Sequence, residues 1–197
     1  MSKHNIRKMH KYARAIMTRD EIKQAISWYD KALADASEIA FKLDMPTHIV
    51  VAVLSALSPN NKWERNIINA YELCKAFQNG QDMDSVKVST YHKMKQKAWS
   101  ILQEIPDYEQ AKVMLNGKKI VSFYSNIMGE DDITIDGHAR NIAYNERVGL
   151  TEAKTSIGIK EYAKLQKEYA IVARENGLKG RQLQAITWVA WKRKHNI

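Results

Sequence analysis

Four side chains in the second half of the chain are of types that catalyse reactions at sugars and phosphates. Lys118 and Lys119 follow an Asn-Gly turn and begin an apolar, helix-like run, and Asp136 and His138 begin the next helical stretch. A lysine at a helix start can bind phosphate together with backbone N–H groups. A desolvated lysine becomes a nucleophile that attacks a sugar carbon, and aspartate and histidine can act as general bases. We therefore expect the two segments to bring an amine and a carboxylate together over one cleft.

The acidic residues and the histidine also have plain structural interpretations. An aspartate directly before a helix is commonly an N-cap, and Asp136 taken alone fits that role. His138 fits a surface position as well as it fits a general base. Asp131 and Asp132 are expected to form a solvated turn rather than a metal site. The choice between cap and catalyst for Asp136 stays open at this level.

The elements that must position these residues are predicted to be helices throughout, because apolar residues recur at a period of 3.6 and no pair of strands is indicated. Thr18 or Asp20 is expected to cap the second helix. The apolar run 47–57 fits a buried strand or a buried helix, and we assign a helix because nothing strand-rich surrounds it. A loop is expected over 151–157. The predicted helices cover residues 4–18, 20–43, 47–57, 62–77, 87–103, 106–114, 118–129, 138–148, 158–176 and 179–194.

The charge of the chain points to a polyanionic partner. The chain has 31 lysines and arginines against 22 aspartates and glutamates, a formal net charge of +9 and a pI of about 9.5. An excess of this size favours nucleic acid first, although a solvated basic surface gives the same composition. No apolar run approaches the roughly 20 residues of a membrane span, so no membrane partner is expected.

Length and cysteine content are typical of a cytoplasmic globular protein. A chain of 197 residues can bury a real core as one domain or two closely packed lobes. No apolar signal core follows the basic N-terminus. Cys74 is the single cysteine, which excludes an intramolecular disulfide, a cysteine-rich zinc site and an iron–sulfur cluster. It lies on the apolar face of its helix and is expected to be inert, and we expect neither a cofactor nor a metal.

Three motifs, in order along the chain, resemble the signature region of a known family. LNGKK (115–119), an apolar helix and ITIDGH (133–138) are similar to the hairpin, packed helix and extended piece of the helix-hairpin-helix (HhH-GPD) DNA glycosylase superfamily. VVAVLSALSPNNKWERNIINA (50–70) and TYHKMKQKAWSIL (90–102) resemble two earlier pieces of that family. The similarity spans about residues 47–148.

The resemblance implies an all-α, two-lobed, endonuclease III-like fold with a DNA-binding cleft between the lobes. Residues 47–130 would form one lobe, with its hairpin near 115–119, and residues 1–46 and 131–197 the other. Proteins of this family extrude a nucleotide from double-stranded DNA and act on it in a pocket. The chain would then be a DNA glycosylase of a bacterial cell or a phage-infected host.

The resemblance also implies roles for single residues. The essential aspartate of the family corresponds to Asp136, and the hairpin lysine that forms a Schiff base in lyase-competent members corresponds to Lys119, with Lys118 a close rival. His138 remains a candidate base. The residues expected to contact DNA are Asn60, Asn61, Lys62, Lys95, Lys97, Asn116, Gly117, Arg140 and Trp191.

Two departures from the family pattern keep other functions open. The hairpin LPGVGxK is shortened to LNGKK, and Leu57 replaces the polar residue that helps fill the gap left by a flipped base, so that Asn60, Asn61 or Lys62 would take over that role. Compact relatives in bacterial viruses resemble DNA base-hypermodifying transferases, in which Asp136 would deprotonate an incoming amine. A non-catalytic DNA-binding module is the third possibility.

Overall fold

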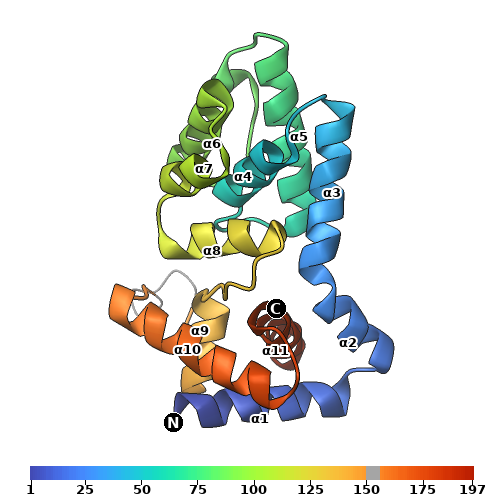
Figure 1. Cartoon of the computed structure of the whole chain (residues 1–197), viewed down its shortest axis with the longest axis vertical. Coiled ribbons are helices and arrows are strands. Elements are labelled where there is room, and N and C mark those ends of the chain that lie inside the picture. The colour runs from blue at the N-terminus through green and yellow to red at the C-terminus, as the bar shows by residue number, and fades with distance from the viewer. Residues whose placement is uncertain (150–155) are drawn as a thin grey trace. The chain divides into compact units, whose positions relative to one another are not determined.

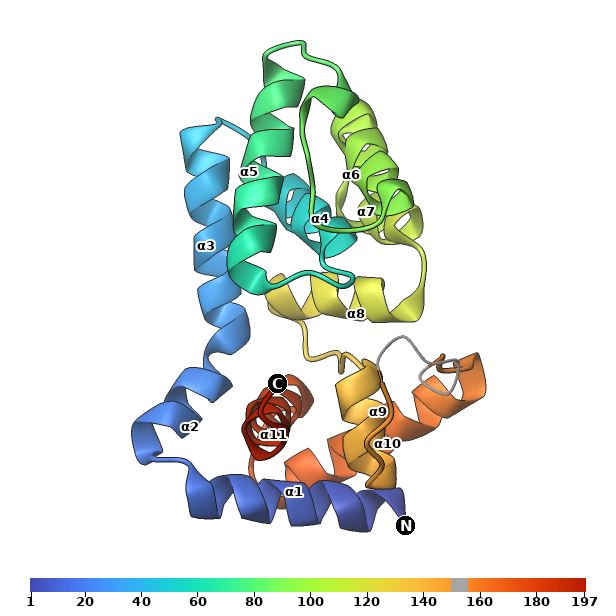
Figure 2. The ribbon, with the colours of Figure 1, turned by 180° about the vertical axis from the view of Figure 1, so that it is seen from behind.

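The computed structural model describes residues 1–149 and 156–197, so most of the loop predicted over 151–157 lies outside the described residues. Within them the chain forms α-helices, one short 3-10 helix and no strand, which confirms the predicted all-α class (Figures 1 and 2). The elements are α1 (Ser2–Ile16), α2 (Arg19–Ile26), α3 (Trp28–Lys42), α4 (Thr47–Leu57), α5 (Trp63–Gln78), η1 (Met83–Ser85), α6 (His92–Glu104), α7 (Tyr108–Leu115), α8 (Lys118–Ile127), α9 (Gly137–Tyr144), α10 (Ile159–Glu175) and α11 (Gly180–His195).

The helix predicted over 20–43 is two helices, which corrects the prediction. Thr18 caps α2 through a capping box, in which its hydroxyl accepts from the Glu21 N–H at 3.2 Å and its own N–H donates to the Glu21 carboxylate at 2.8 Å. The chain breaks at Ser27, whose hydroxyl donates to the Lys23 carbonyl at 3.0 Å. Such local bonds compete with the helix. The apolar period continues across the break, so the period alone does not reveal it.

Two other helices are shorter than predicted. α6 begins at His92 rather than near residue 87, because the preceding residues are held in an extended turn by side chains such as Asn69, which accepts from the Ser89 N–H at 2.9 Å. α9 ends at Tyr144 rather than at Val148, since Asn145 adopts a left-handed conformation with φ of 54°. Asparagine tolerates that conformation better than most residues.

The chain divides into two compact units. Unit 1 comprises Met1–Tyr29 and Gly129–Ile197, and unit 2 comprises Asp30–Met128. The first boundary lies inside α3 and the second directly after α8. The sequence predicted the first boundary near residue 46, after this helix rather than inside it, and the second near residue 130.

Unit 1 is built around the packing of α1 on α9, α10 and α11, with α2 against α11. Its core is apolar and includes two buried tyrosines and one buried tryptophan. The larger buried members are Ile6, Ile135, Ile142, Tyr162, Leu165, Tyr169, Val172, Leu183, Ile186 and Trp191.

Unit 2 is built around α4, which packs against α5, α6, α7 and α8. Every residue from Ile49 to Leu57 is buried, which explains why this stretch has no polar face. Cys74 on α5 is fully buried, and burial raises the pKa of its thiol to about 12. The predicted inert core position of Cys74 is therefore confirmed.

No single helix in the described part of the chain is long and apolar enough to cross a membrane. α3 and α4 meet that requirement only as a pair, and the two are bent by 119° at the break between them.

Candidate functional site

The segment that leads to Asp136 is extended but pairs with no strand, and side chains of α10 satisfy its backbone. The Tyr162 hydroxyl accepts from the Ile135 N–H at 3.1 Å and donates to the Ile133 carbonyl at 3.4 Å. Gln166 donates to the same carbonyl at 3.0 Å and to the Asp132 carboxylate at 2.6 Å. Buried backbone groups need such partners, because leaving them unpaired costs free energy. The segment is thereby fixed in one conformation.

The acidic pair before this segment is exposed at Asp131 and half-buried at Asp132, and it also has a structural role that the sequence did not predict. Asp131 accepts from the Gly180 N–H at 3.1 Å and the Arg181 N–H at 3.0 Å, so it caps the start of α11 from a distant part of the sequence. The close approach requires a glycine, because a Cβ on Gly180 would lie 2.5 Å from the Ile133 side chain. The described residues contain no group of three or more histidine, cysteine, aspartate or glutamate side chains suited to a metal ion.

Asp136 is the N-cap of α9. Its Oδ1 accepts from the Ala139 N–H at 2.8 Å, and within the described part of unit 1 its Oδ2 has no hydrogen-bond partner. The Tyr169 hydroxyl of α10 donates to the Ala139 carbonyl at 3.2 Å. Burial raises the pKa of Tyr169, and the charge of Asp136 raises it further. The half-buried carboxylate thus has one oxygen committed to the helix and one oxygen uncommitted.

The other predicted residues of unit 1 are engaged in packing and ion pairs. The His138 ring lies edge-on to Trp188, with 6.0 Å between ring centroids. Arg140 pairs with Glu146 at 3.1 Å and with Glu161 at 3.4 Å, which uses the charge that was predicted to contact DNA. Trp191 is 2% exposed and belongs to the core. Its ring is therefore not presented to a base, which corrects that prediction.

The predicted hairpin is a two-residue turn between helices of unit 2. α7 ends at Leu115, Asn116 and Gly117 have φ of 44° and 94°, and α8 begins at Lys118. No side chain caps α8, and the first N–H groups of a helix have no partner within it. The side chains of Lys118 and Lys119 are exposed. Both side chains are therefore open to solvent, whereas a lysine becomes a nucleophile when its amine is desolvated.

Two lysines of α6 that were predicted to contact DNA have partners inside unit 2. Lys97 donates to the Leu115 carbonyl and, at 3.5 Å, to the Asn116 carbonyl, so it binds the open end of α7 at the hairpin. Burial lowers the pKa of Lys97, and the charge of Lys93 lowers it further. Lys95 is buried and pairs with Asp84 at 3.3 Å. Lys97 thus acts on the hairpin itself, and Lys95 is not a surface residue.

The turn between α4 and α5 contains one structural asparagine and two exposed residues. Asn61 donates to the Leu57 carbonyl at 3.2 Å and approaches Asn69 Oδ1 at 3.4 Å. Asn60 and Lys62 are exposed and remain available for the predicted DNA contact. The buried amides of α5, Asn66 and Asn69, were not predicted, although two asparagines on the apolar face of an amphipathic helix indicate such a network.

The positive charge is concentrated in unit 1. By sequence, unit 1 has 19 lysines and arginines against 11 aspartates and glutamates, a net charge of +8, whereas unit 2 has 12 against 11, a net charge of +1. The candidate residues are divided in the same way. Asp136, His138, Arg140 and Trp191 belong to unit 1, and the hairpin and the α4–α5 turn belong to unit 2.

Comparison with known proteins places the chain in a family. Residues 2–195 match DUF7178, a family of unknown function. The chain belongs to DUF7178. No curated protein and no solved structure matches it. The DUF7178 match runs through both units and includes the hairpin and Asp136.

Proposed function

We propose that this member of DUF7178 is a DNA-binding enzyme that acts on a flipped nucleotide and cleaves the N-glycosidic bond of a modified or damaged base. The observation that carries the proposal is the state of Asp136. Its segment is fixed by Tyr162 and Gln166, one carboxylate oxygen is held by α9, and the other is uncommitted within unit 1. A carboxylate fixed in this way can stabilise the positive charge that develops at the sugar, or activate an attacking water.

The hairpin and the charge of unit 1 support DNA as the substrate. The uncapped start of α8 offers backbone N–H groups to a phosphate, with Lys118 and Lys119 exposed beside them. Unit 1 supplies a net charge of +8 for further phosphate contacts. Because neither hairpin lysine is desolvated, we expect water rather than a lysine to attack the sugar.

A base-modifying transferase is the second candidate, and the same exposed lysines favour it over a glycosylase with a lysine nucleophile. In that reaction a free amine displaces pyrophosphate from an activated thymine-derived base, and Asp136 takes the proton from the amine. The glycosidic bond survives. The amine then comes from the second substrate, so that no desolvated lysine is needed.

One assay separates these candidates. The full chain is incubated with duplex oligonucleotides that carry thymine, uracil, 5-hydroxymethyluracil or oxidised bases. A further duplex carries pyrophosphorylated 5-hydroxymethyluracil, and a free amino acid is added to it as the amine substrate. The nucleosides are measured by mass spectrometry. Release of a free base supports the glycosylase, and gain of an amine with loss of pyrophosphate supports the transferase. Binding without either product overturns both in favour of a DNA-binding module.

Asp136→Asn tests the site itself. Asparagine caps a helix as well as aspartate does, so the variant removes the charge and keeps the fold. We expect turnover to fall by about 100-fold or more while DNA affinity stays within about twofold. Asp20→Asn, which removes an exposed carboxylate from the first turn of α2, is the matched control and should leave turnover unchanged. Equal turnover of Asp136→Asn and the parent chain would reject the assignment.

Borohydride should trap no covalent DNA adduct on Lys118 or Lys119.

A further inference from the structure

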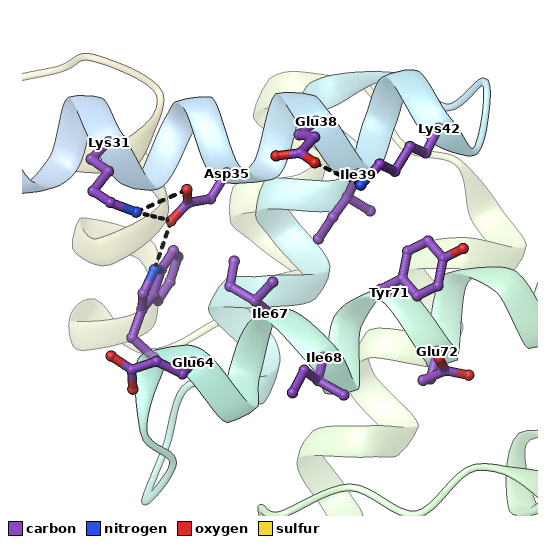
Figure 3. Close-up of a pocket in the computed structure, with 11 residues that line it drawn as sticks. Lys31, Asp35, Glu38, Ile39, Lys42, Glu64, Ile67, Ile68, Tyr71 and Glu72 are labelled. Atoms are coloured by element: carbon purple, nitrogen blue, oxygen red, sulfur yellow. Dashed lines mark hydrogen bonds and ion pairs between the residues drawn. The ribbon is translucent and has the colours of Figure 1, made fainter.

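A groove of about 730 Å³ runs between α3 and α5, and every residue that lines it belongs to unit 2. Figure 3 shows the two helices side by side, with side chains of both turned into the space between them. The lining stretches run from Lys31 to Lys42 and from Trp63 to Glu72. At 1.5 Å per residue each is roughly 15 Å long. The groove is therefore about as long as three turns of a helix.

The middle of the groove is apolar. Ile39 from α3 and Ile67, Ile68 and Tyr71 from α5 line it, and Ile68 is 51% exposed. On α5, Tyr71 is spaced i+4 from Ile67 and i+3 from Ile68, so Tyr71 is a neighbour of both isoleucines on the helix surface. An open apolar strip of this shape matches the apolar face of a helix laid between α3 and α5.

The α3 edge of the groove carries no excess charge. Lys31 pairs with Asp35 at 3.0 Å and Lys42 pairs with Glu38 at 2.6 Å. The Trp63 indole N–H donates to Asp35 at 3.0 Å, which joins the two helices at one end of the groove. These bonds fix the α3 edge as a neutral, ordered wall.

The α5 edge is acidic. Glu64 and Glu72 lie at its two ends, and among the described residues neither has an ion-pair partner. With four carboxylates and two lysines the groove has a net charge of −2, although the whole chain has +9. Such a charge repels phosphate and attracts a basic partner.

We propose that the α3–α5 groove docks a basic amphipathic helix of a partner protein over about three turns. The apolar face of the helix covers Ile67, Ile68 and Tyr71, and lysines or arginines near its two ends pair with Glu64 and Glu72. The groove shares no residue with the hairpin or with the segment of Asp136. Docking is therefore compatible with the DNA-binding proposal and independent of it.

Designed peptides of 14 residues are the probes. One is a helix with leucines at i, i+3, i+4 and i+7 and lysines at both ends, and the other has glutamates in place of the lysines. Each carries a fluorophore and is titrated with the full chain, and binding is followed by anisotropy. We expect the lysine peptide to bind at least about tenfold more tightly than the glutamate peptide.

Variants of the groove locate the binding. Ile68→Lys should weaken binding of the lysine peptide by about tenfold or more. The pair Glu64→Lys and Glu72→Lys should reverse the preference between the two peptides. The pair Asp82→Lys and Glu104→Lys makes the same charge change at exposed positions of unit 2 outside the groove, and should leave the preference as it is. Circular dichroism melting checks that each variant is folded.

The following results would overturn the proposal. The first is equal binding of the lysine peptide to the parent chain and to folded Ile68→Lys, or no binding at millimolar concentration. The second is displacement of the peptide by equimolar spermidine, which would make the groove a small-cation site. The third is that light scattering shows the parent chain to be a dimer and Ile68→Lys to be a monomer, since the occupant of the groove would then be a second copy of the chain.

Discussion

The candidate residues of unit 1 and those of unit 2 are held in opposite ways. In unit 1 the segment before Asp136 is held by Tyr162 and Gln166, and its neighbour Asp131 holds α11 in return. In unit 2 the hairpin leaves its own side chains exposed and is tied to the unit through Lys97. A carboxylate that acts on a reacting atom requires a fixed position, whereas a turn that binds phosphate through its backbone requires access. The contrast is the one expected of a catalytic group and a docking element.

Removal of the Tyr162 hydroxyl should loosen the fixed segment of unit 1 and so test the first half of the comparison. Tyr162→Phe leaves the buried Ile135 N–H without its acceptor, so we expect a loss of about 2 kcal/mol in the free energy of unfolding. Turnover should fall severalfold with DNA affinity unchanged. Urea titration and the nucleoside assay measure the two effects. Tyr12→Phe, at a half-buried tyrosine of α1, is the control. Unchanged stability of Tyr162→Phe would mean that the segment is not held as described.

Removal of the Lys97 ammonium group should loosen the hairpin of unit 2 and so test the second half of the comparison. Lys97→Met releases the carbonyls at the end of α7, which should cost about 1 kcal/mol and loosen the hairpin. Lys93→Met removes an equal charge from an exposed position on the same helix. If the hairpin backbone binds phosphate, Lys97→Met should weaken DNA binding about threefold more than Lys93→Met, as measured by anisotropy. Equal losses would leave only bulk charge to explain binding.

A gain in stability is expected where unit 2 is strained, at the residue that ends α6. Ile105 adopts φ of 44° and is 60% exposed, and a β-branched residue is unfavourable in that conformation. Ile105→Gly should raise the free energy of unfolding by about 0.5 kcal/mol, because the relief of strain exceeds the entropic cost of glycine. Ile105→Ala keeps most of the strain and should give a smaller gain. Thermal unfolding of both variants tests the order.

The smallest effect concerns the pH dependence of unit 1. The side chain of Arg193 and the Thr18 N–H bind the Glu21 carboxylate and lower its pKa from 4.5 to about 2. A lowered pKa in the folded chain means that this stabilisation is complete above pH 4.5 and is lost as the pH falls to about 2. Glu21→Gln should therefore lower the melting temperature by about 1–2 °C at pH 6, and the difference should vanish near pH 2. A constant difference across that range would contradict the assignment.

Local signals predicted the parts of the fold that are settled locally. The cap predicted at Thr18 or Asp20 is Thr18, an aspartate before a helix gives the cap at Asp136, and a Gly after Asn116 gives the turn between α7 and α8. Apolar content left a strand and a helix open for α4, because burial on all sides removed the helical period, and the absence of strand-rich neighbours led to the correct choice of a helix.

The parts that were missed depend on partners far along the chain. Asp131 accepts hydrogen bonds from residues 49 and 50 positions away, so nothing near it in the sequence distinguishes it from a solvated turn. Lys97 binds a carbonyl 18 positions away, and Trp191 is buried by several other helices. In each case residue type suggested a surface role and tertiary packing assigned another.

The burial of Cys74 has a practical consequence for experiments on this chain. Thiol reagents attack the thiolate, and a buried thiol with its pKa raised to about 12 supplies almost none. Cys74 therefore does not have to be replaced before a labelling cysteine is introduced. A cysteine introduced at the exposed Lys62 of unit 2 or the exposed Lys160 of unit 1 would carry a fluorophore or spin label alone, with Cys74 left in place. Each unit can then report on DNA or peptide binding through its own probe.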